Sequence, residues 1–399
     1  MPTQIGVGFS KKADSFAAGQ QVATKAMAGI NSSTIDLVLT FCNGKHDPHQ
    51  FLAGVRSVTF NAPLLGGAAM GVFTNSDLSY EEYESSVTVF SSDTIQFKIF
   101  REPGLDKDEY ATGIGLATQI KNADVGDDRG LLVFYDTIKN SVPARYNHST
   151  SLFDAMETII DKNICFAAGG MVGDLQRMQC FQFFNDEVIS QHAMALVIGG
   201  KCQMRNTTIH GCRPSSSYKT ITKTEGPMIY EIDNRPALEV IQEMFAGKKV
   251  SWDEFPFFVT LGRNKGDKYG EPKREDYVNR MCLAVDKEKK ALVMTNPDFK
   301  AGDDVQIMHI NIDFDYLHQE MDALKIATGN EKLLYYFYID CIGRAKPFTG
   351  GDLEDAAEVQ RKIDNKIPLM GFYTGAEVSK VQNEIRSMVW TGVLCLLTE

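Results

Sequence analysis

Residues 62–71 read Ala-Pro-Leu-Leu-Gly-Gly-Ala-Ala-Met-Gly, and this segment decides the fold because its pattern returns later in the chain. Residues 164–171, Ile-Cys-Phe-Ala-Ala-Gly-Gly-Met, form a second apolar run that enters a pair of glycines. A short apolar run of this composition is typical of a buried strand. The repetition indicates that one structural unit is used more than once.

The segments around the two glycine pairs follow each other in the same order. Each copy contains a leading helix, a strand, a second helix, the glycine segment and a pair of strands. In the first copy we expect these elements at 14–27, 36–41, 51–55, 62–71, 87–90 and 95–99. In the second copy we expect them at 108–120, 131–135, 151–160, 164–171, 181–184 and 188–198. This order predicts an internal duplication.

A third and looser copy is expected near the C-terminus. A strand over 334–339, a helix over 352–362 and a closing strand over 388–397 keep the order of the other copies. The segment 367–375 echoes residues 62–66. The repeated unit therefore extends into the second half of the chain.

Interleaved strands and helices with antiparallel strand pairs predict an α+β or mixed α/β fold in two domains, built from repeated strand-helix-strand-strand units. The length of 399 residues agrees with two domains. We expect an N-terminal domain over 1–200, duplicated as about 1–100 and 101–200, and a C-terminal domain over 229–399. The stretch Cys-Arg-Pro-Ser-Ser-Ser at 212–217 predicts a linker over 201–228.

The composition argues against several classes of function. The chain carries 41 basic and 52 acidic residues, and its formal net charge of −11 repels nucleic-acid backbones and anionic membranes. The eight cysteines form no CxxC pair, so we expect them to be reduced rather than bound to zinc. Neither a signal peptide nor an apolar run of the ~20 residues needed by a membrane helix is present. We therefore expect a cytoplasmic protein with no nucleic-acid or membrane partner.

Seven short motifs occur in the order known from one family. They are Ile-Gly-Val-Gly-Phe-Ser (5–10), Ala-Pro-Leu-Leu-Gly-Gly (62–67), Ala-Gly-Gly (168–170), Gly-Cys-Arg-Pro (211–214), Ile-Asp-Asn-Arg-Pro-Ala-Leu-Glu-Val (232–240), Cys-Ile-Gly-Arg (341–344) and Gly-Phe-Tyr-Thr-Gly-Ala-Glu (371–377). In this order the chain resembles the FIST family of signal-transduction sensory domains, with a FIST N-terminal domain followed by a FIST C-terminal domain. The resemblance implies a sensor of small ligands, with amino acids suggested, that signals through a separate partner. Some members of the family are haem-binding nitric oxide sensors that act with a histidine kinase.

The glycine pairs Gly66-Gly67 and Gly169-Gly170 are the first candidate ligand contacts. Glycine permits close approach to the backbone, so a ligand can lie against bare amides. The alternative is tight packing between the repeated units, which favours the same residue. Arg213, in the motif at 211–214, joins this candidate set. Neither GxGxxG nor GxxxxGK[ST] occurs, so a nucleotide-binding loop is not supported.

The C-terminal motifs supply the second set of candidate ligand-binding residues. These are Cys341, Arg344, Gly371, Tyr373 and Glu377. They lie at strand ends, where open sheets usually present ligand sites. Arg344 offers a planar fork to a carboxylate and Glu377 can accept an ammonium group, so the pair suits an amino acid or another zwitterion. The alternative is a structural ion pair of Arg344 with Glu377 or with a nearby aspartate.

Two other chemistries stay open as alternatives. Cys341 or Cys42 could be the nucleophile of a cysteine-dependent hydrolase, provided that its pKa were lowered. Haem is a possible cofactor, held by the Cys341 thiolate or by a histidine. The histidines are His46, His49, His148, His192, His210, His309 and His318. Because neither HExxH nor another catalytic signature occurs, we predict a binding protein rather than an enzyme, with no metal site.

The sequence thus predicts a sensor that binds an amino-acid-like small molecule and acts on a separate signalling protein. The first alternative is a haem-binding nitric oxide sensor that acts on a histidine kinase. The second alternative is the cysteine-dependent hydrolase.

Overall fold

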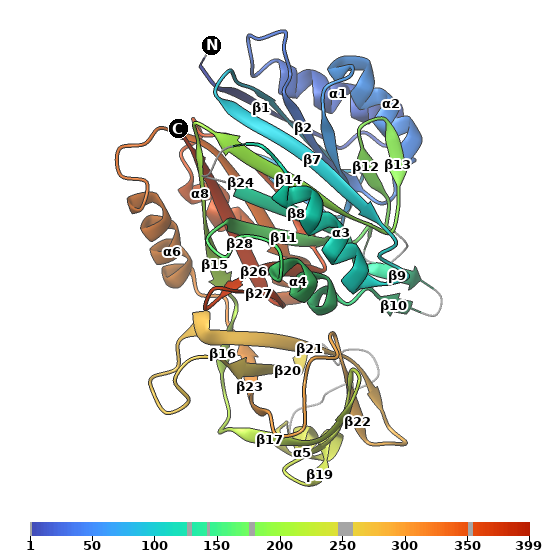
Figure 1. Cartoon of the computed structure of the whole chain (residues 1–399), viewed down its shortest axis with the longest axis vertical. Coiled ribbons are helices and arrows are strands. Elements are labelled where there is room, and N and C mark those ends of the chain that lie inside the picture. The colour runs from blue at the N-terminus through green and yellow to red at the C-terminus, as the bar shows by residue number, and fades with distance from the viewer. Residues whose placement is uncertain (1, 126–129, 142–143, 175–179, 246–257, 350–353) are drawn as a thin grey trace.

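The computed structural model of the chain describes residues 2–125, 130–141, 144–174, 180–245, 258–349 and 354–399. Figure 1 shows a large domain of sheets flanked by helices and, below it, a smaller domain made mostly of strands. The α+β class and the division into two domains are confirmed. Among the described helices, none has the length and apolar character required to cross a membrane.

Three six-stranded sheets with one common plan make up the large domain. The first runs in the order β1 (Gln4–Ser10), β6 (Ser85–Ser91), β2 (Leu37–Asn43), β3 (Leu64–Ala69), β12 (Gln182–Phe184) and β13 (Glu187–Ile189). The second runs β7 (Ile95–Pro103), β14 (His192–Gly200), β8 (Gly130–Asp136), β11 (Cys165–Met171), β26 (Ala376–Val381) and β27 (Glu384–Met388). The third runs β15 (Gln203–His210), β28 (Thr391–Thr398), β24 (Leu333–Cys341), β25 (Leu369–Thr374), β4 (Val72–Thr74) and β5 (Leu78–Ser79).

The three units exchange hairpins in a closed cycle. The first sheet ends in the β12–β13 hairpin of the second unit, and the second sheet ends in the β26–β27 hairpin of the third unit. The third sheet ends in β4 and β5 of the first unit. In each unit the two central strands pair in parallel, as β2 with β3, β8 with β11 and β24 with β25. No unit can therefore complete its sheet without its neighbour.

Helices cover each of the three sheets. They are α1 (Ser15–Met27) and α2 (Pro48–Thr59) on the first, α3 (Glu109–Lys121) and α4 (Ser149–Glu157) on the second, and α6 (Phe314–Ile326) and α8 (Asp355–Lys362) on the third. The leading helix of every unit begins at an aspartate, namely Asp14, Asp108 or Asp313, whose carboxylate accepts the third following backbone N–H. This cap satisfies a donor that the first helical turn leaves free. The helix expected over 352–362 begins at Asp355, and residues 350–353 lie outside the described residues.

The three sheets meet in one apolar core. Each unit contributes an aromatic ring from its central strand: the ring centroids of Phe41 and Phe134 lie 5.4 Å apart, and that of Phe337 lies 6.1 Å from Phe41 and 6.0 Å from Phe134. Phe372 stacks on Phe41 at 4.2 Å. All four side chains are buried, and the described residues fill the centre of the large domain apart from a space of about 20 Å³ beside Phe337.

The small domain is inserted into the third unit, between β15 and α6. Its strands are β16 (Cys212–Pro214), β17 (Lys219–Glu225), β18 (Met228–Ile232), β19 (Arg235–Pro236), β20 (Thr260–Asn264), β21 (Tyr277–Asp286), β22 (Ala291–Met294) and β23 (Asp304–Ile310). A pairing between β20 and β23 closes six of these strands into a ring, against which α5 (Ala237–Met244) packs. The short elements η2 (Arg274–Asp276), β9 (Ile138–Ser141), β10 (Ala144–Tyr146), η3 (Ile342–Arg344) and α7 (Lys346–Thr349) complete the described structure.

The predicted linker over 201–228 is wrong. Residues 203–210 form β15, which pairs with β28 along its whole length, and the rest of the range contains β16 and β17. The proline and serines at 214–217 mark a local turn inside the small domain. The expected C-terminal domain over 229–399 is consequently split, because the chain returns to the large domain after β23.

Candidate functional site

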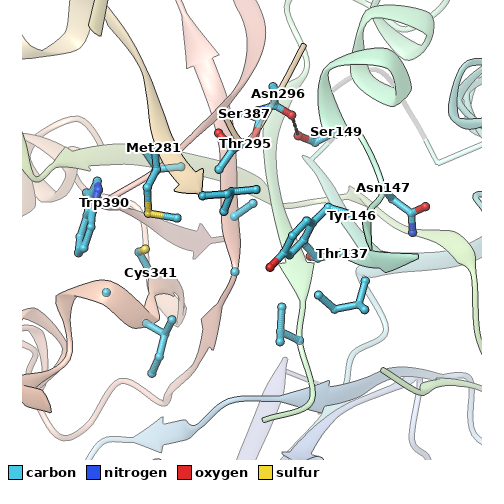
Figure 2. A pocket seen from close by; sticks show the side chains of 18 of the residues that line it. Thr137, Tyr146, Asn147, Ser149, Met281, Thr295, Asn296, Cys341, Ser387 and Trp390 are labelled. Carbon is cyan, nitrogen blue, oxygen red and sulfur yellow. Dashed lines mark hydrogen bonds between the residues drawn. The ribbon is translucent and has the colours of Figure 1, made fainter. Parts of the chain in front are cut away.

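A cleft of about 190 Å³ lies where the second unit, the third unit and the small domain meet (Figure 2). The second unit contributes Tyr135, Thr137, Tyr146, Asn147 and Ser149. The third unit contributes Cys341, Gly343, Ala376, Ser387 and Trp390, and the small domain contributes Met281, Leu283, Thr295 and Asn296. We call this space the three-part cleft. A cavity of roughly 150 Å³ holds one benzene molecule, so the three-part cleft has room for a single-ring compound.

The hairpin exchange places these residues together. Tyr135 and Cys341 lie at the carboxyl ends of the central strands β8 and β24. The third unit's β26 pairs with the second unit's β11, with Ala376 opposite Gly170. This pairing carries the third unit's hairpin to the strand end of the second unit, so the two strand ends share one space.

Three hydrogen bonds join the small domain to the walls of the cleft. Arg280, on β21, is 1% exposed and donates from Nη1 to the Ser387 carbonyl oxygen at 2.5 Å. The Ser149 hydroxyl donates to Asn296 Oδ1 at 3.3 Å, as Figure 2 shows. On the opposite side, the Trp390 indole donates to Thr260 Oγ1 at 3.0 Å. The small domain thus forms one wall of the cleft and is held against the other two.

The lining of the three-part cleft is uncharged. Among the described residues that line it, none is Asp, Glu, Lys, Arg or His. Burial raises the pKa of the Tyr135 phenol above its usual range, although the hydroxyls of Ser149 and Ser387 oppose this shift. Four polar atoms of lining residues have no hydrogen-bond partner among the described residues: the Tyr135 hydroxyl, Thr137 Oγ1, Asn147 Oδ1 and Thr295 Oγ1. Buried polar atoms normally have partners, so these atoms are candidates for contacts with a ligand.

A second, more open hollow of about 560 Å³ adjoins the three-part cleft. The two spaces share Tyr146, Leu283 and Thr295. The lining of the outer hollow includes charged or titratable side chains, namely Glu109, Lys139, Arg145 and His148. The polarity therefore changes from charged outside to uncharged inside along the shared boundary.

Family comparisons cover most of the chain. The FIST N domain matches residues 36–235, and the FIST C domain matches residues 237–380. This chain belongs to the FIST family. The predicted FIST resemblance is thereby confirmed, and it indicates a sensory role in which a small ligand is bound. The boundary between the two FIST matches falls next to β19, inside the small domain.

Individual relatives of this FIST protein are distant. An uncharacterized protein of Methanocaldococcus jannaschii is 24% identical over 191 residues, which cover 46% of this chain and 35% of that protein. This chain therefore spans only that minor share of the relative's length. A cyanuric acid hydrolase from A. caulinodans aligns with a TM-score of 0.29 and 9% identity over 50% of this chain and 71% of its own. A second cyanuric acid hydrolase aligns over 100% of both chains, with a TM-score of 0.37 and 8% identity.

The expected site for a zwitterion, made by Arg344 and Glu377, does not form in this FIST protein. Arg344 is 2% exposed, and its guanidinium pairs with the buried carboxylates of Asp340, at 3.5 Å, and Asp355. Glu377 is fully buried and accepts hydrogen bonds from Thr374 Oγ1 at 2.6 Å and from the Thr391 backbone N–H at 3.4 Å. Both side chains are engaged by groups of the protein itself, and neither lines the cleft. Arg344 thus makes the structural ion pair with nearby aspartates that was the alternative.

The five candidate glycines face atoms of the protein itself. They are Gly66, Gly67, Gly169, Gly170 and Gly371. A Cβ atom at Gly66 would lie 1.7 Å from the Thr40 carbonyl oxygen, and one at Gly371 would lie 2.1 Å from the Phe73 ring. None of the five lines the three-part cleft. Close packing between strands and units accounts for these positions.

The other candidates are divided between the core, the surface and the cleft. Tyr373 is fully buried, and its ring packs against Phe73 at 5.4 Å and Tyr80 at 5.7 Å. The half-exposed Arg213 pairs with Asp313 at 2.6 Å, outside the cleft. Cys341 alone among the ten candidate ligand-binding residues lines the cleft.

Sequence reasoning missed most of the cleft. Tyr135 is the penultimate residue of β8 and Thr137 follows the strand, so both lie at the strand end that corresponds to that of Cys341 in the third unit. The same alignment of strand ends that singled out Cys341 would have identified them. Trp390 and Thr295 carried no such signal, because strand pairings between distant segments bring them to the site.

The two cysteines proposed as nucleophiles are not activated. Burial, followed by the charge of Glu84, raises the pKa of the Cys42 thiol well above its usual range. Burial and the charge of Glu377 do the same to the pKa of the Cys341 thiol. A reactive cysteine needs the opposite shift. Neither thiol therefore shows the lowered pKa that the cysteine-dependent hydrolase requires.

Haem does not fit the residues of the three-part cleft. A space for one aromatic ring is smaller than a tetrapyrrole. None of the seven histidines lines the cleft, and the Cys341 thiol is held neutral by its raised pKa. Within the described ranges, no group of three or more His, Cys, Asp or Glu side chains could hold a metal ion.

Proposed function

We propose that this FIST protein is a sensor that binds a small molecule in the three-part cleft and transmits binding as a change in how the small domain sits on the large domain. The observation that carries the proposal is the composition of the cleft walls. A molecule in this space touches Tyr135 or Thr137, Ser387 or Trp390, and Met281 or Thr295. Its binding energy therefore depends on the relative position of all three parts, which is the requirement for a ligand-driven shift.

Trp390 connects the ligand space to the crossing between the domains. The chain enters the small domain at Gly211 and leaves it at Asn311, and the Asn311 N–H donates to the Gly211 carbonyl oxygen at 2.7 Å. The Gly211 N–H donates in turn to the Trp390 carbonyl oxygen at 2.9 Å, and Arg344 Nη1 donates to the same oxygen at 2.8 Å. We call the crossing at Gly211 and Asn311 the hinge. A ligand that displaces Trp390 thus acts directly on this hinge.

The backbone of Trp390 supports this role. Its φ angle is 58°, a value that is unusual for a bulky side chain. Such strain persists only where surrounding contacts impose it, and it is common in switch regions. Here the Thr260, Gly211 and Arg344 contacts impose the conformation. In this proposal the change is read by a separate signalling protein, with a histidine kinase as the class that the family resemblance suggests.

Tryptophan fluorescence tests the proposal. The chain has two tryptophans, so Trp252→Phe leaves Trp390 as the single indole. A library of small metabolites that includes the amino acids is titrated against this variant, and melting temperature is measured in parallel. We expect a ligand that shifts the Trp390 emission, raises the melting temperature and alters hydrogen exchange at Gly211 and Asn311.

The Trp390→Phe variant is the control, in which the indole signal of the cleft is lost. If no compound changes either the emission or the melting temperature, the proposed function is wrong. If a ligand changes both but leaves exchange at Gly211 and Asn311 unaltered, binding is established and the hinge mechanism is wrong.

A further inference from the structure

We infer that the three-part cleft selects an uncharged single-ring molecule with hydrogen-bonding edges, rather than an ion or a zwitterion. The inference rests on the proposed function and names the class of its ligand. It departs from the amino-acid-like ligand expected from the sequence. Three features of the cleft carry it: the lining, the neighbouring charges and the polar atoms without partners.

The lining offers no counter-charge to a ligand. Among the described residues around the cleft, the side chains are apolar, aromatic, hydroxyl, amide or thiol. Moving an ionised carboxylate or ammonium into such surroundings costs much more than moving an amide or a hydroxyl that finds a hydrogen bond. A charged ligand would therefore lose its hydration without gaining an ion pair.

The charges behind the walls are already neutralised. Arg344 pairs with Asp340 and Asp355, so its guanidinium is not free to receive a carboxylate. On the small-domain side, Arg280 Nη2 binds Asp298 at 2.6 Å. Both guanidinium groups are thus taken by carboxylates of the protein, and neither is free to receive an anionic ligand.

Asp136 and Glu377 are also turned inward. Asp136 is fully buried and accepts hydrogen bonds from the backbone N–H groups of Ile138 and Gln191 and from Gln191 Nε2. Glu377 is held by Thr374 and Thr391. Neither carboxylate lines the cleft, so neither is available to an ammonium group.

The walls suit a flat molecule with polar edges. Figure 2 shows Trp390 and Met281 on one side of the cleft and Tyr146 and Thr137 on the other. Large aromatic and thioether surfaces of this kind favour packing against a ring. Thr137 Oγ1 and Thr295 Oγ1 lack partners among the described residues, and hydroxyls both donate and accept, so they match amide or ureide groups at the edge of a ring.

The decisive experiment compares ligands that differ in charge but not in shape. Benzamide, benzoate and benzamidinium are neutral, anionic and cationic versions of one single-ring molecule. These three compounds are titrated against the Trp252→Phe protein while Trp390 emission is followed. Other single-ring compounds, matched in the same way as neutral, anionic and cationic triplets, and the free amino acids are titrated in the same assay. We expect the compounds that bind to be the neutral members, at least about tenfold tighter than their charged partners.

A pair of variants tests whether the cleft itself sets this order. Thr295→Asp places a carboxylate in the lining, so we expect the cationic member of a binding triplet to become the tightest. Thr295→Val keeps nearly the same shape without a charge, so we expect the neutral member of each triplet to remain the tightest ligand. Circular dichroism and the melting temperature establish that both variants are folded.

The outcomes separate this inference from the proposed function. Tighter binding of anions, cations or amino acids by the parent protein overturns the inference and leaves the sensor intact. An unchanged order in Thr295→Asp means that the compounds bind elsewhere, which also overturns it. The absence of binding in every charge class overturns the proposed function and the inference together.

Discussion

The strand end of the first unit and the strand ends of the second and third units are built on the same plan but have different surroundings. In the first unit, Asn43 ends β2 and its amide donates to Glu84 Oε1 at 2.6 Å. Glu84 is fully buried and also accepts from Ser79 Oγ at 3.2 Å and from the Glu82 N–H at 2.9 Å. In the other two units, Tyr135, Thr137 and Cys341 at the strand ends line the three-part cleft, where the small domain supplies the third wall.

This difference shows that the repeated unit supplies the scaffold and the insertion supplies the site. At the strand end of the first unit, Glu84 of the same unit accepts the hydrogen bonds of Asn43 and Ser79. The hairpin exchange brings two strand ends together, and the inserted small domain encloses the space beside them. A binding site thus arises where the threefold repetition is broken.

The largest effect is expected from removing the contact that holds the small domain to the cleft wall. Arg280→Ala takes one of two arginine partners from the partly buried Asp298, which keeps Arg263, and leaves the Ser387 carbonyl oxygen without Arg280. Because Asp298 keeps Arg263, we expect a cost at the lower end of the range for a broken buried ion pair, about 3 kcal/mol of stability. We expect this loss in chemical denaturation, together with loss of the ligand response of Trp390.

Arg235→Ala is the matched control for this variant. Arg235 also lies in the small domain and pairs with a glutamate, Glu243, but both side chains are about half exposed. We expect its unfolding midpoint and ligand response to match those of the parent protein. Equal behaviour of the two arginine variants would contradict the role assigned to Arg280.

A smaller effect, confined to stability, is expected at the closed strand end of the first unit. Glu84→Ala removes the acceptor of Asn43, Ser79 and the Glu82 N–H, and unpaired buried donors cost about 1–3 kcal/mol. Because Glu84 does not line the three-part cleft, we expect unchanged ligand affinity at Trp390. The substitution Glu81→Ala, at a nearby exposed residue, is the control for stability. A tenfold change in affinity would show that this strand end takes part in binding.

The smallest effect concerns pH and the last residues of β2 and β8. Asn43 ends β2, whereas Asp136 ends β8, and burial raises the pKa of Asp136 to about 7. A carboxyl whose pKa is higher in the folded than in the unfolded protein destabilises the fold as pH rises from its unfolded pKa toward its folded pKa. We therefore expect a contribution that lowers stability between about pH 4 and pH 7.

Asp136→Asn makes the second unit resemble the first and removes this contribution. The variant should show a flatter dependence of unfolding free energy on pH over that interval, measured by urea denaturation. It exchanges one acceptor of Gln191 for a donor, so a small uniform loss of stability is expected beside the change in slope. A slope identical to that of the parent protein would show that Asp136 does not titrate in this range.

Much of the fold was accessible from local patterns. The buried strand at 164–171, the helices beginning after Asp14 and Asp108, and the third copy ending in 388–397 all depend on residues close together in sequence. The candidate site was less accessible. Cys341 was found because it ends a strand, and an ion pair of Arg344 with a nearby aspartate was kept as an alternative, but Asp355 was not named because it approaches from α8.

The sequence by itself determined the repeated units, their aspartate-capped helices and the FIST membership, because hydrophobic periodicity, capping and motif order are set within short stretches of chain. Only the tertiary structure decided the exchange of hairpins, the insertion of the small domain and the uncharged lining of the cleft. Pairings such as Ala376 with Gly170 join residues far apart in the chain, and they depend on the packing of whole sheets against one another. The site is formed by that packing, and therefore no single segment encodes it.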